Sequence, residues 1–373
     1  MSALCRLKPK KFSVKKSGRD KKVLVAMSGG VDSSVAAFLL HKDGYCVAGT
    51  TMQLGIKGTG NDTAKCGGDA VSDARNVCNW ISIPHYTFDF AEVMEAKVIG
   101  KFISEYVSGR TPNPCVDCNE HLKFGLLMDR AKEMGFDCLA TGHYAIIDRE
   151  ENDFVLKKPK DRKKDQTYFL YAIGRKILDS VLFPLGNLTK EEVRKIAEQQ
   201  GMPVAEKPES QDICFIGHNE RETFFSDRLG NIPTGQITDR SGRVLGMHKG
   251  IVFYTIGQRG GLGISHPTPL YVIKIDPDRN RIVVGEKEDL RSRGLVAGNL
   301  KQLCNNWPER AQAKIRYRKK EIDCRIAENG HRLEVSFDED QEAVTPGQSV
   351  VFYDRDILLG GGIIEGAIDG DNR

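Results

Sequence analysis

The sequence predicts an α/β protein in which a doubly wound parallel sheet is followed by a small linker domain and a C-terminal β-barrel. The first half alternates short β-branched runs with amphipathic segments. After about Gly217 the chain is rich in glycine and turn signals, and from about Lys287 short apolar runs alternate with polar turns. Because 373 residues exceed what one core usually supports, we expect several domains. The predicted division is a basic tail over 1–22, an α/β domain over 23–217, a linker domain over 218–286 and a barrel over 287–373.

Each element of this fold is predicted by its own local pattern. Apolar, β-branched runs predict strands at Val23–Met27, Cys46–Thr51, His85–Phe90 and Cys138–Thr141. Amphipathic segments predict helices at Val31–Lys42, Asp69–Trp80, Ala91–Val107 and Asn119–Met134. Three later runs predict barrel strands at Ala311–Tyr317, Arg332–Phe337 and Ser349–Tyr353. Ligands of such a parallel sheet bind at the carboxyl ends of its strands.

Composition and charge exclude some classes of protein. Hydrophobic residues make up 40% and charged residues 28%, and no apolar run approaches the roughly 20 residues that a membrane span needs, so no membrane partner is expected. Ten cysteines without a signal peptide indicate a reducing compartment, and we expect a cytoplasmic protein. The net charge is +4, but nine Lys or Arg and one acid lie in 1–22. A nucleic-acid partner would therefore be held by local basic patches, while the tail itself fits either a solvated arm or an auxiliary RNA contact.

A glycine loop directly follows the first predicted strand. It reads Ser28-Gly29-Gly30-Val31-Asp32-Ser33-Ser34 and continues into a helical pattern. Two glycines allow a tight turn with backbone N–H groups facing one cavity, and the helix N-terminus favours an anion, so the loop predicts a phosphate site. It lacks the Gly-Lys-Thr or Gly-Lys-Ser of kinase-type loops and the spacing of dinucleotide fingerprints.

The loop resembles that of ATP pyrophosphatases, which cleave ATP between its α and β phosphates. That resemblance implies that ATP lies against Ala26, Met27 and the residues Ser28 to Ser34. It further implies that Asp32 holds magnesium, and that Met52 and Gly142 lie beside the adenosine.

The second informative stretch contains two cysteines. In Arg110-Thr111-Pro112-Asn113-Pro114-Cys115-Val116-Asp117-Cys118-Asn119, two prolines stiffen the approach to a Cys-x-x-Cys pair that opens a helix. We expect the helix N-terminus to favour the thiolates and make at least one thiol reactive. A third candidate is Cys214, which lies between a polar entry and an apolar exit.

Several motifs in register give a wider resemblance. The glycine loop, the Arg-Thr-Pro-Asn-Pro stretch with Cys118-Asn119, Ala140 to Tyr144, Lys164 to Leu170, Ile213 to Ile216 and Arg316 to Arg318 occur in the order found in the tRNA-specific 2-thiouridylase family, which the chain resembles over nearly its whole length. The resemblance implies that Cys118 is the catalytic nucleophile and that Cys214 carries a persulfide. It implies tRNA contacts at Asn113, Pro114, Cys115, His143, Lys164, Asp165, Gln166, Arg316, Tyr317, Arg318 and Gln348.

Two positions depart from the commoner form of that family. The residue after Asn113-Pro114 is usually Asp but is Cys115 here, and the usual cation-acid pair after Asn119 is Glu120 and His121. Cys115, Cys118 and Cys214 suit a 4Fe-4S cluster with one open iron better than a zinc site, which wants four ligands. The alternative is a persulfide relay between Cys214 and Cys118, with Cys115 as a spare thiol. The sulfur donor is then a cysteine desulfurase, a sulfur-relay protein or free sulfide.

Two basic stretches predict RNA contacts. Residues 157–164 hold six cations around one acid, and Arg316-Tyr317-Arg318-Lys319-Lys320 interleaves an aromatic ring with cations, which suits stacking on an unpaired base. The predicted activity is ATP-dependent 2-thiolation of the wobble uridine of the Lys, Glu and Gln tRNAs. Two rivals remain: an ATP pyrophosphatase that amidates a small molecule, and a tRNA-binding protein without catalysis.

Overall fold

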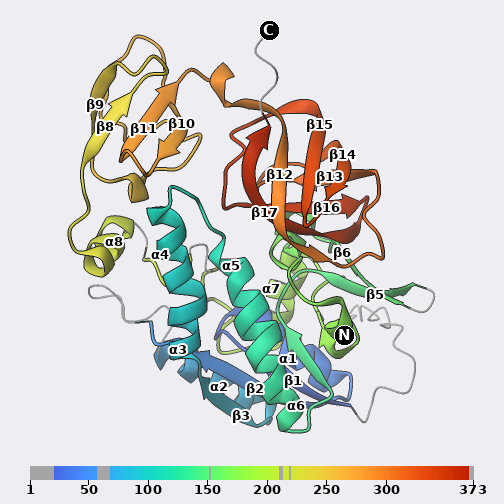
Figure 1. Ribbon diagram of the computed structural model, residues 1–373. Coiled ribbons are helices and arrows are strands. Elements are labelled where there is room, and N and C mark those ends of the chain that lie inside the picture. The colour runs from blue at the N-terminus through green and yellow to red at the C-terminus, as the bar shows by residue number, and fades with distance from the viewer. Residues whose placement is uncertain (1–20, 57–67, 151–152, 210–212, 218–219, 369–373) are drawn as a thin grey trace, which may run out of the picture.

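The structure is a computed structural model that describes residues 21–56, 68–150, 153–209, 213–217 and 220–368 (Figure 1). The basic tail up to residue 20 lies outside the described residues, as do Cys5 and Cys66. The predictions made for that tail therefore stay predictions.

The first layer is a five-stranded parallel sheet with the order β3-β2-β1-β4-β7. The order reverses between β1 and β4, which pair directly, so the loops that leave these two strands border one crevice. This confirms the predicted parallel sheet. Its strands are β1 (Lys22–Ala26), β2 (Cys46–Gln53), β3 (His85–Asp89), β4 (Cys138–Thr141) and β7 (Val181–Leu182).

Helices cover both faces of this sheet. One continuous helical stretch begins at Pro114 rather than at Asn119 as predicted, because proline is favoured at the first helical position and leaves no N–H unpaired. Its middle is a wide π-helix. The helices are α1 (Val31–Lys42), α2 (Gly68–Ile81), α3 (Ala91–Met94), η1 (Glu95–Ile99), α4 (Gly100–Val107), α5 (Pro114–Asp117), η2 (Cys118–Leu127), α6 (Met128–Glu133), α7 (Lys190–Gln199) and α8 (Arg221–Leu229). Short 3-10 turns are η3 (Arg162–Lys164), η4 (Thr167–Phe169), η5 (Arg175–Ser180), η6 (Ile251–Phe253) and η7 (Glu288–Leu290).

The linker domain is built on a four-stranded sheet with the order β10-β11-β8-β9. Apolar side chains from three of its strands, including Ile237, Val272 and Ile282, are fully buried in a small core of their own. The strands are β8 (Gly235–Thr238), β9 (Val244–His248), β10 (Tyr271–Asp276) and β11 (Arg281–Gly285).

The C-terminal strands close into a barrel, because β12 pairs with both β15 and β17. These strands are β12 (Arg291–Gln302), β13 (Arg310–Lys314), β14 (Ile322–Asn329), β15 (Arg332–Glu342), β16 (Ser349–Asp354) and β17 (Ile357–Ile368). The predicted barrel is confirmed, but β13 ends at Lys314. The predicted strand ran to Tyr317, where the chain instead turns toward β14.

A hairpin from the α/β domain extends the sheet of the barrel. It consists of β5 (Ile146–Glu150) and β6 (Asp153–Lys157), and β6 pairs with β17 through Lys157 and Ile357. The linker domain and the barrel stand on the same side of the parallel sheet, with α4 and α5 running between them and the sheet (Figure 1). Among the described helices, none has the length and apolar character that crossing a membrane requires.

Candidate functional site

The glycine loop lies at the carboxyl end of β1, between Ala26 and the start of α1 at Val31. Gly29 has a φ of +71°, and a Cβ there would lie 2.7 Å from the carbonyl oxygen of Ala70. The Ser33 and Ser34 hydroxyls donate to the Gly30 carbonyl at 3.2 and 2.8 Å. The loop therefore turns tightly enough to direct its backbone donors and the α1 N-terminus to one place, which fits a phosphate group.

Gly142, at the end of β4, packs directly against the glycine loop. A Cβ at Gly142 would lie 2.7 Å from the backbone nitrogen of Ser33. Only glycine therefore permits this approach across the point where the strand order reverses. Met52 lies at the end of the neighbouring strand β2, half-buried against the main core. Met52 and Gly142 therefore lie at the carboxyl edge of the sheet, where ligands were expected. Their contact with adenosine stays a prediction.

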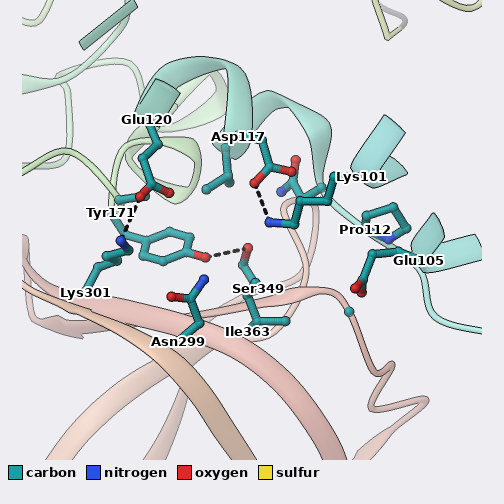
Figure 2. Close-up of a pocket in the computed structure, with 14 residues that line it drawn as sticks. Lys101, Glu105, Pro112, Asp117, Glu120, Tyr171, Asn299, Lys301, Ser349 and Ile363 are labelled. Carbon is teal, nitrogen blue, oxygen red and sulfur yellow. Dashed lines mark hydrogen bonds and ion pairs between the residues drawn. The ribbon is translucent and has the colours of Figure 1, made fainter. Parts of the chain in front are cut away.

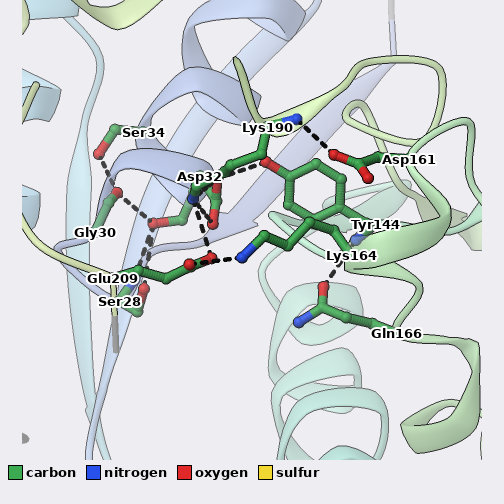
Figure 3. A network of polar contacts seen from close by, with 11 residues as sticks. Ser28, Gly30, Asp32, Ser34, Tyr144, Asp161, Lys164, Gln166, Lys190 and Glu209 are labelled. Atoms are coloured by element: carbon green, nitrogen blue, oxygen red, sulfur yellow. Dashed lines mark hydrogen bonds and ion pairs between the residues drawn. The ribbon is translucent and has the colours of Figure 1, made fainter. Parts of the chain in front are cut away.

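Asp32 lies in the first turn of α1, inside a network of polar contacts (Figure 3). Its Oδ1 accepts a hydrogen bond of 2.8 Å from the Tyr144 hydroxyl. Lys190 Nζ lies 2.7 Å from both carboxylate oxygens. The carboxylate thus binds one cation, Lys190, and magnesium, which prefers oxygen ligands, would have to replace that ammonium to bind here.

The network extends from Asp32 to the segment that carries Cys214. Lys190 Nζ lies 3.4 Å from Glu209 Oε1, and Lys164 Nζ lies 2.6 Å from Glu209 Oε2. On the other side of the loop, Lys207 Nζ donates to the Gly29 carbonyl at 3.1 Å and pairs with Asp73. Two ammonium groups, those of Lys190 and Lys207, thus contact the residues of the glycine loop and could bind phosphate oxygens.

The three candidate cysteines come from two segments that face each other. Cys115 and Cys118 lie in the first turns of the helix that begins at Pro114; Cys115 is exposed and Cys118 is buried. Cys214 is exposed, and its neighbour Phe215 is buried against Phe102, with ring centroids 5.2 Å apart. The Phe215 ring thereby anchors the segment of Cys214 on α4, the helix that precedes the Cys115–Cys118 stretch in the chain.

The thiols are less acidic than expected from the helix N-terminus. Although Cys115 as a residue is exposed, the surrounding protein atoms desolvate its thiol, and this desolvation, followed by the charge of Cys214, raises the pKa of Cys115 to about 12. Burial also raises the pKa of Cys118, against the opposing effect of Lys123. Desolvation therefore opposes the preference for thiolates that was predicted from the helix N-terminus, and the reactivity of these thiols stays a prediction. The charge of Cys214 raises the pKa of both other thiols.

Asn119 and Lys123 hold the start of this helix in place. The buried Asn119 donates to the Phe169 carbonyl at 2.9 Å and accepts from Lys123 Nζ at 3.0 Å. His143 is close by; burial, followed by Lys123, lowers its pKa well below the ordinary value, so the ring is neutral. Its Nδ1 lies 2.7 Å from the Thr141 hydroxyl. Lys123 is thus the cation that influences both thiols and His143.

The turn after β13 brings the barrel to the cysteines. The rings of Tyr317 and Phe169 have centroids 4.5 Å apart, and Cys115 is among the groups that raise the pKa of Tyr317, after burial. Arg316 Nη2 donates to Ile256 O, Ala343 O and Thr345 Oγ1 at 3.2, 2.9 and 2.8 Å. Arg318, in contrast, is exposed. Arg318 is therefore the better placed of the two arginines for a phosphate.

Other predicted tRNA contacts hold the protein's own loops. The buried Asp165 accepts from both the backbone nitrogen and the hydroxyl of Thr167, at 2.9 and 2.6 Å. Gln166 Oε1 accepts from the Tyr144 backbone nitrogen at 2.8 Å. Gln348 Nε2 donates to the Thr111 carbonyl at 3.0 Å, just before the helix that Asn113 precedes and Pro114 begins. Their contact with tRNA stays a prediction.

Comparison with known proteins places the chain in a family. A family model described as the tRNA methyl transferase HUP domain matches residues 21–218, its PRC-barrel domain matches 222–286, and an aminomethyltransferase beta-barrel domain matches 292–364. The tRNA-specific 2-thiouridylase MnmA 1 of Syntrophus aciditrophicus is 56% identical over 93% of this chain and 94% of its own length. The chain belongs to the tRNA-specific 2-thiouridylase family. A 2-thiouridylase of Clostridium botulinum (strain Loch Maree) is 46% identical over 92% of this chain and 99% of its own length.

A solved structure covers about half of this 2-thiouridylase family member. It is a 4-thiouridine synthetase–RNA complex with bound ATP, 19% identical, covering 52% of this chain and 45% of its own, with a TM-score of 0.36. A likeness of that size adds nothing to the assignment, which rests on the sequence relatives.

Several residues of this 2-thiouridylase site were not predicted from the sequence. Lys190 lies 158 positions from Asp32, and Glu209 and Lys123 were not singled out either. One signal was present for Lys190: Thr189 and Glu192 form a capping box, which marks a helix start. That pattern predicts a helix N-terminus but not which strand end it faces.

A pocket lies behind the helix that begins at Pro114, here called the cysteine helix, between that helix and the barrel (Figure 2). Lys101 Nζ pairs with the buried Asp117 and Lys301 Nζ with Glu120, each at 2.7 Å. Glu120 differs from the commoner family pattern, and its ion pair with Lys301 joins the cysteine helix to the C-terminal barrel. Asp117, Glu120 and His121 also offer oxygen and nitrogen atoms within 4.8 Å of one another, but the lysines already neutralise both carboxylates.

Proposed function

We propose that this protein is a tRNA-uridine 2-sulfurtransferase that uses ATP to convert the wobble uridine of the Lys, Glu and Gln tRNAs to 2-thiouridine. The family assignment supports this reaction. The observation that carries it is that two chemistries are linked along the chain: Glu209 contacts Lys190 at the glycine loop, and Cys214, five residues later, raises the pKa of Cys118 through its charge. A nucleotide site and a thiol site are thereby held by one short segment.

The first step activates the uracil. Its 2-oxygen attacks the α-phosphorus of ATP held on the glycine loop, and the bond to pyrophosphate breaks. Magnesium on Asp32 would supply positive charge to the departing pyrophosphate. Uracil must leave the anticodon stack to reach this site, as bases generally do for chemistry at ring atoms. Tyr317 and Phe169 offer rings near Cys115 against which such a base can stack.

The second step replaces oxygen by sulfur. In a relay, the terminal sulfur of a Cys214 persulfide attacks C2, and AMP leaves with the original 2-oxygen. The Cys118 thiolate then attacks Cys214 Sγ, the bond to the transferred sulfur breaks, and a Cys118–Cys214 disulfide remains for a reductant to open. The donor that loads Cys214 would be a cysteine desulfurase or a sulfur-relay protein.

A cluster is the alternative that Cys115 supports. Three thiols of two facing segments offer the soft ligands that iron–sulfur clusters use, and their mutual repulsion as thiolates favours a bound cation. When bound, a 4Fe-4S cluster with one open iron would hold hydrosulfide taken from free sulfide. We favour the cluster because position 115 holds a cysteine in this chain, whereas the commoner family residue at this position, Asp, has no thiol to serve as the third ligand. Both arrangements need a reducing compartment such as the cytoplasm.

A reconstituted reaction tests the proposal. Purified protein prepared without oxygen, ATP, magnesium, sulfide or a persulfide donor and an unmodified tRNA transcript should yield 2-thiouridine, measured by mass spectrometry of nucleosides. A transcript with cytidine at the wobble position is the control and should remain unmodified. Consumption of ATP with ammonia and a small acceptor, without tRNA, would instead favour the amidating ATP pyrophosphatase. Tight tRNA binding without turnover would indicate a tRNA-binding protein that has lost catalysis.

A further inference from the structure

Lys190 has an unusual position for a lysine outside the motifs. Its side chain is only 12% exposed, and its Nζ lies 2.7 Å from both oxygens of Asp32 and 3.4 Å from Glu209. The stem is fixed because Lys190 is the first residue of α7 and its backbone nitrogen donates to Asp161 at 2.9 Å. Its ammonium thus lies where the predicted magnesium would bind Asp32.

Ammonium and magnesium cannot share one carboxylate without repelling each other. Magnesium bound to Asp32 with ATP would displace Lys190 from these oxygens. The displaced ammonium has a short path available, because Glu209 lies beside it and the polyphosphate of ATP would enter along the glycine loop. Lysine suits such a move, since it is a compact charge on a flexible stem.

We propose that Lys190 is a phosphate-binding residue of the ATP site, which holds Asp32 while the site is empty and passes to the β or γ phosphate oxygens when magnesium takes Asp32. This inference rests on the proposed use of ATP. Glu209 steadies the ammonium during the exchange and remains paired with Lys164. Because Glu209 precedes Cys214 by five residues, the exchange takes place at the base of the segment that carries the sulfur.

Nucleotide binding without tRNA tests this role. The ligands are α,β-methylene-ATP with magnesium, which cannot be cleaved to AMP, and AMP, which lacks the phosphates that Lys190 would contact. Lys190→Met should weaken binding of the triphosphate by about tenfold or more, as expected for one lost charge-assisted contact, and change AMP binding by less than about twofold. Lys190→Arg should retain most of the preference for the triphosphate. Lys195→Met, an exposed lysine of the same helix, is the control and should bind both ligands as the wild type does.

The outcomes separate the inference from the proposed function. Equal weakening of both nucleotides by Lys190→Met would reduce Lys190 to a structural role and overturn the inference, as would unchanged binding of both. Either result with intact thiolation by the wild type leaves the proposed function in place. A wild-type protein that binds neither nucleotide would refute the proposed use of ATP, and the inference with it. Melting temperatures of the variants, measured without nucleotide, show whether each has folded.

Discussion

At the scale of single residues, we propose that Asp32 and Cys115 determine which chemistry the site can perform. Asp32 lies at the N-terminus of α1, and Lys190 and Tyr144 contact its oxygens. The carboxylate is therefore placed to bind a cation. Cys115 adds a third thiol to a pair that would suffice for sulfur exchange alone. Each residue can be replaced without touching the cores of the domains.

Asp32→Ala should abolish tRNA-dependent pyrophosphate release and leave tRNA affinity nearly unchanged. The reason is that, in the proposed mechanism, the carboxylate serves the departing pyrophosphate through magnesium, whereas tRNA is held by other surfaces. Pyrophosphate release and tRNA binding are measured on the same preparation. Normal turnover by this variant would remove Asp32 from the site.

Cys115→Ala distinguishes the two routes of sulfur delivery. If the three thiols hold a cluster, protein prepared without oxygen should be brown and contain about four irons per chain, and this variant should lose both colour and activity. In a relay, Cys118→Ala and Cys214→Ala should be inactive, while Cys115→Ala stays active. Full thiolation by iron-free wild-type protein with a persulfide donor would exclude the cluster.

At the scale of elements, the contact between the end of β4 and the start of α1 shapes the nucleotide site. Gly142→Ala would place a methyl group 2.7 Å from the Ser33 nitrogen, so the glycine loop must shift. We expect a loss of ATP affinity of about tenfold or more with a modest fall in melting temperature, since the strain falls on the loop rather than on the core. Gly174→Ala is a suitable control because a Cβ there meets open space. Equal ATP affinity in both variants would contradict this account.

Elements were predicted correctly where the residues that determine them lie within one short segment of the sequence. The run Val31–Lys42 forms α1 with the predicted bounds, and the glycine loop precedes it as expected. The hairpin of β5 and β6 was not predicted, because its pairing with β17 joins residues 200 positions apart. The same limit applies to Lys190 and to Arg316, whose partners come from distant loops. The burial of Cys118 was also not predicted, since it depends on packing between segments that are distant in the sequence.

At the scale of the whole molecule, the three domains meet around the cysteine helix. Arg316 joins the barrel to Ile256 of the linker domain, and Lys301 joins the barrel to Glu120. Five of the six cations in 157–164 have acidic partners in the described part of the chain. Pairs at the surface are weak, so tRNA phosphates can compete for these cations.

Arg316 and Arg318 should therefore behave differently when replaced. Arg318→Ala should reduce the salt dependence of tRNA binding by about one unit of slope, as expected for one phosphate contact. Arg316→Ala should instead lower the melting temperature, because three internal acceptors lose their donor. Arg279→Ala, an exposed arginine of the linker domain, is the control for the salt titration. An unchanged slope in Arg318→Ala would mean that this arginine does not touch the tRNA backbone.

The fate of one oxygen atom tests the central claim most directly. A tRNA transcript carrying ¹⁸O at the 2-position of the wobble uracil is thiolated by the purified protein with ATP, and the AMP product is analysed by mass spectrometry. Adenylation of the 2-oxygen followed by displacement predicts one ¹⁸O in each AMP formed with 2-thiouridine. AMP without the label, alongside 2-thiouridine, would mean that ATP is cleaved at a different acceptor and would contradict the mechanism.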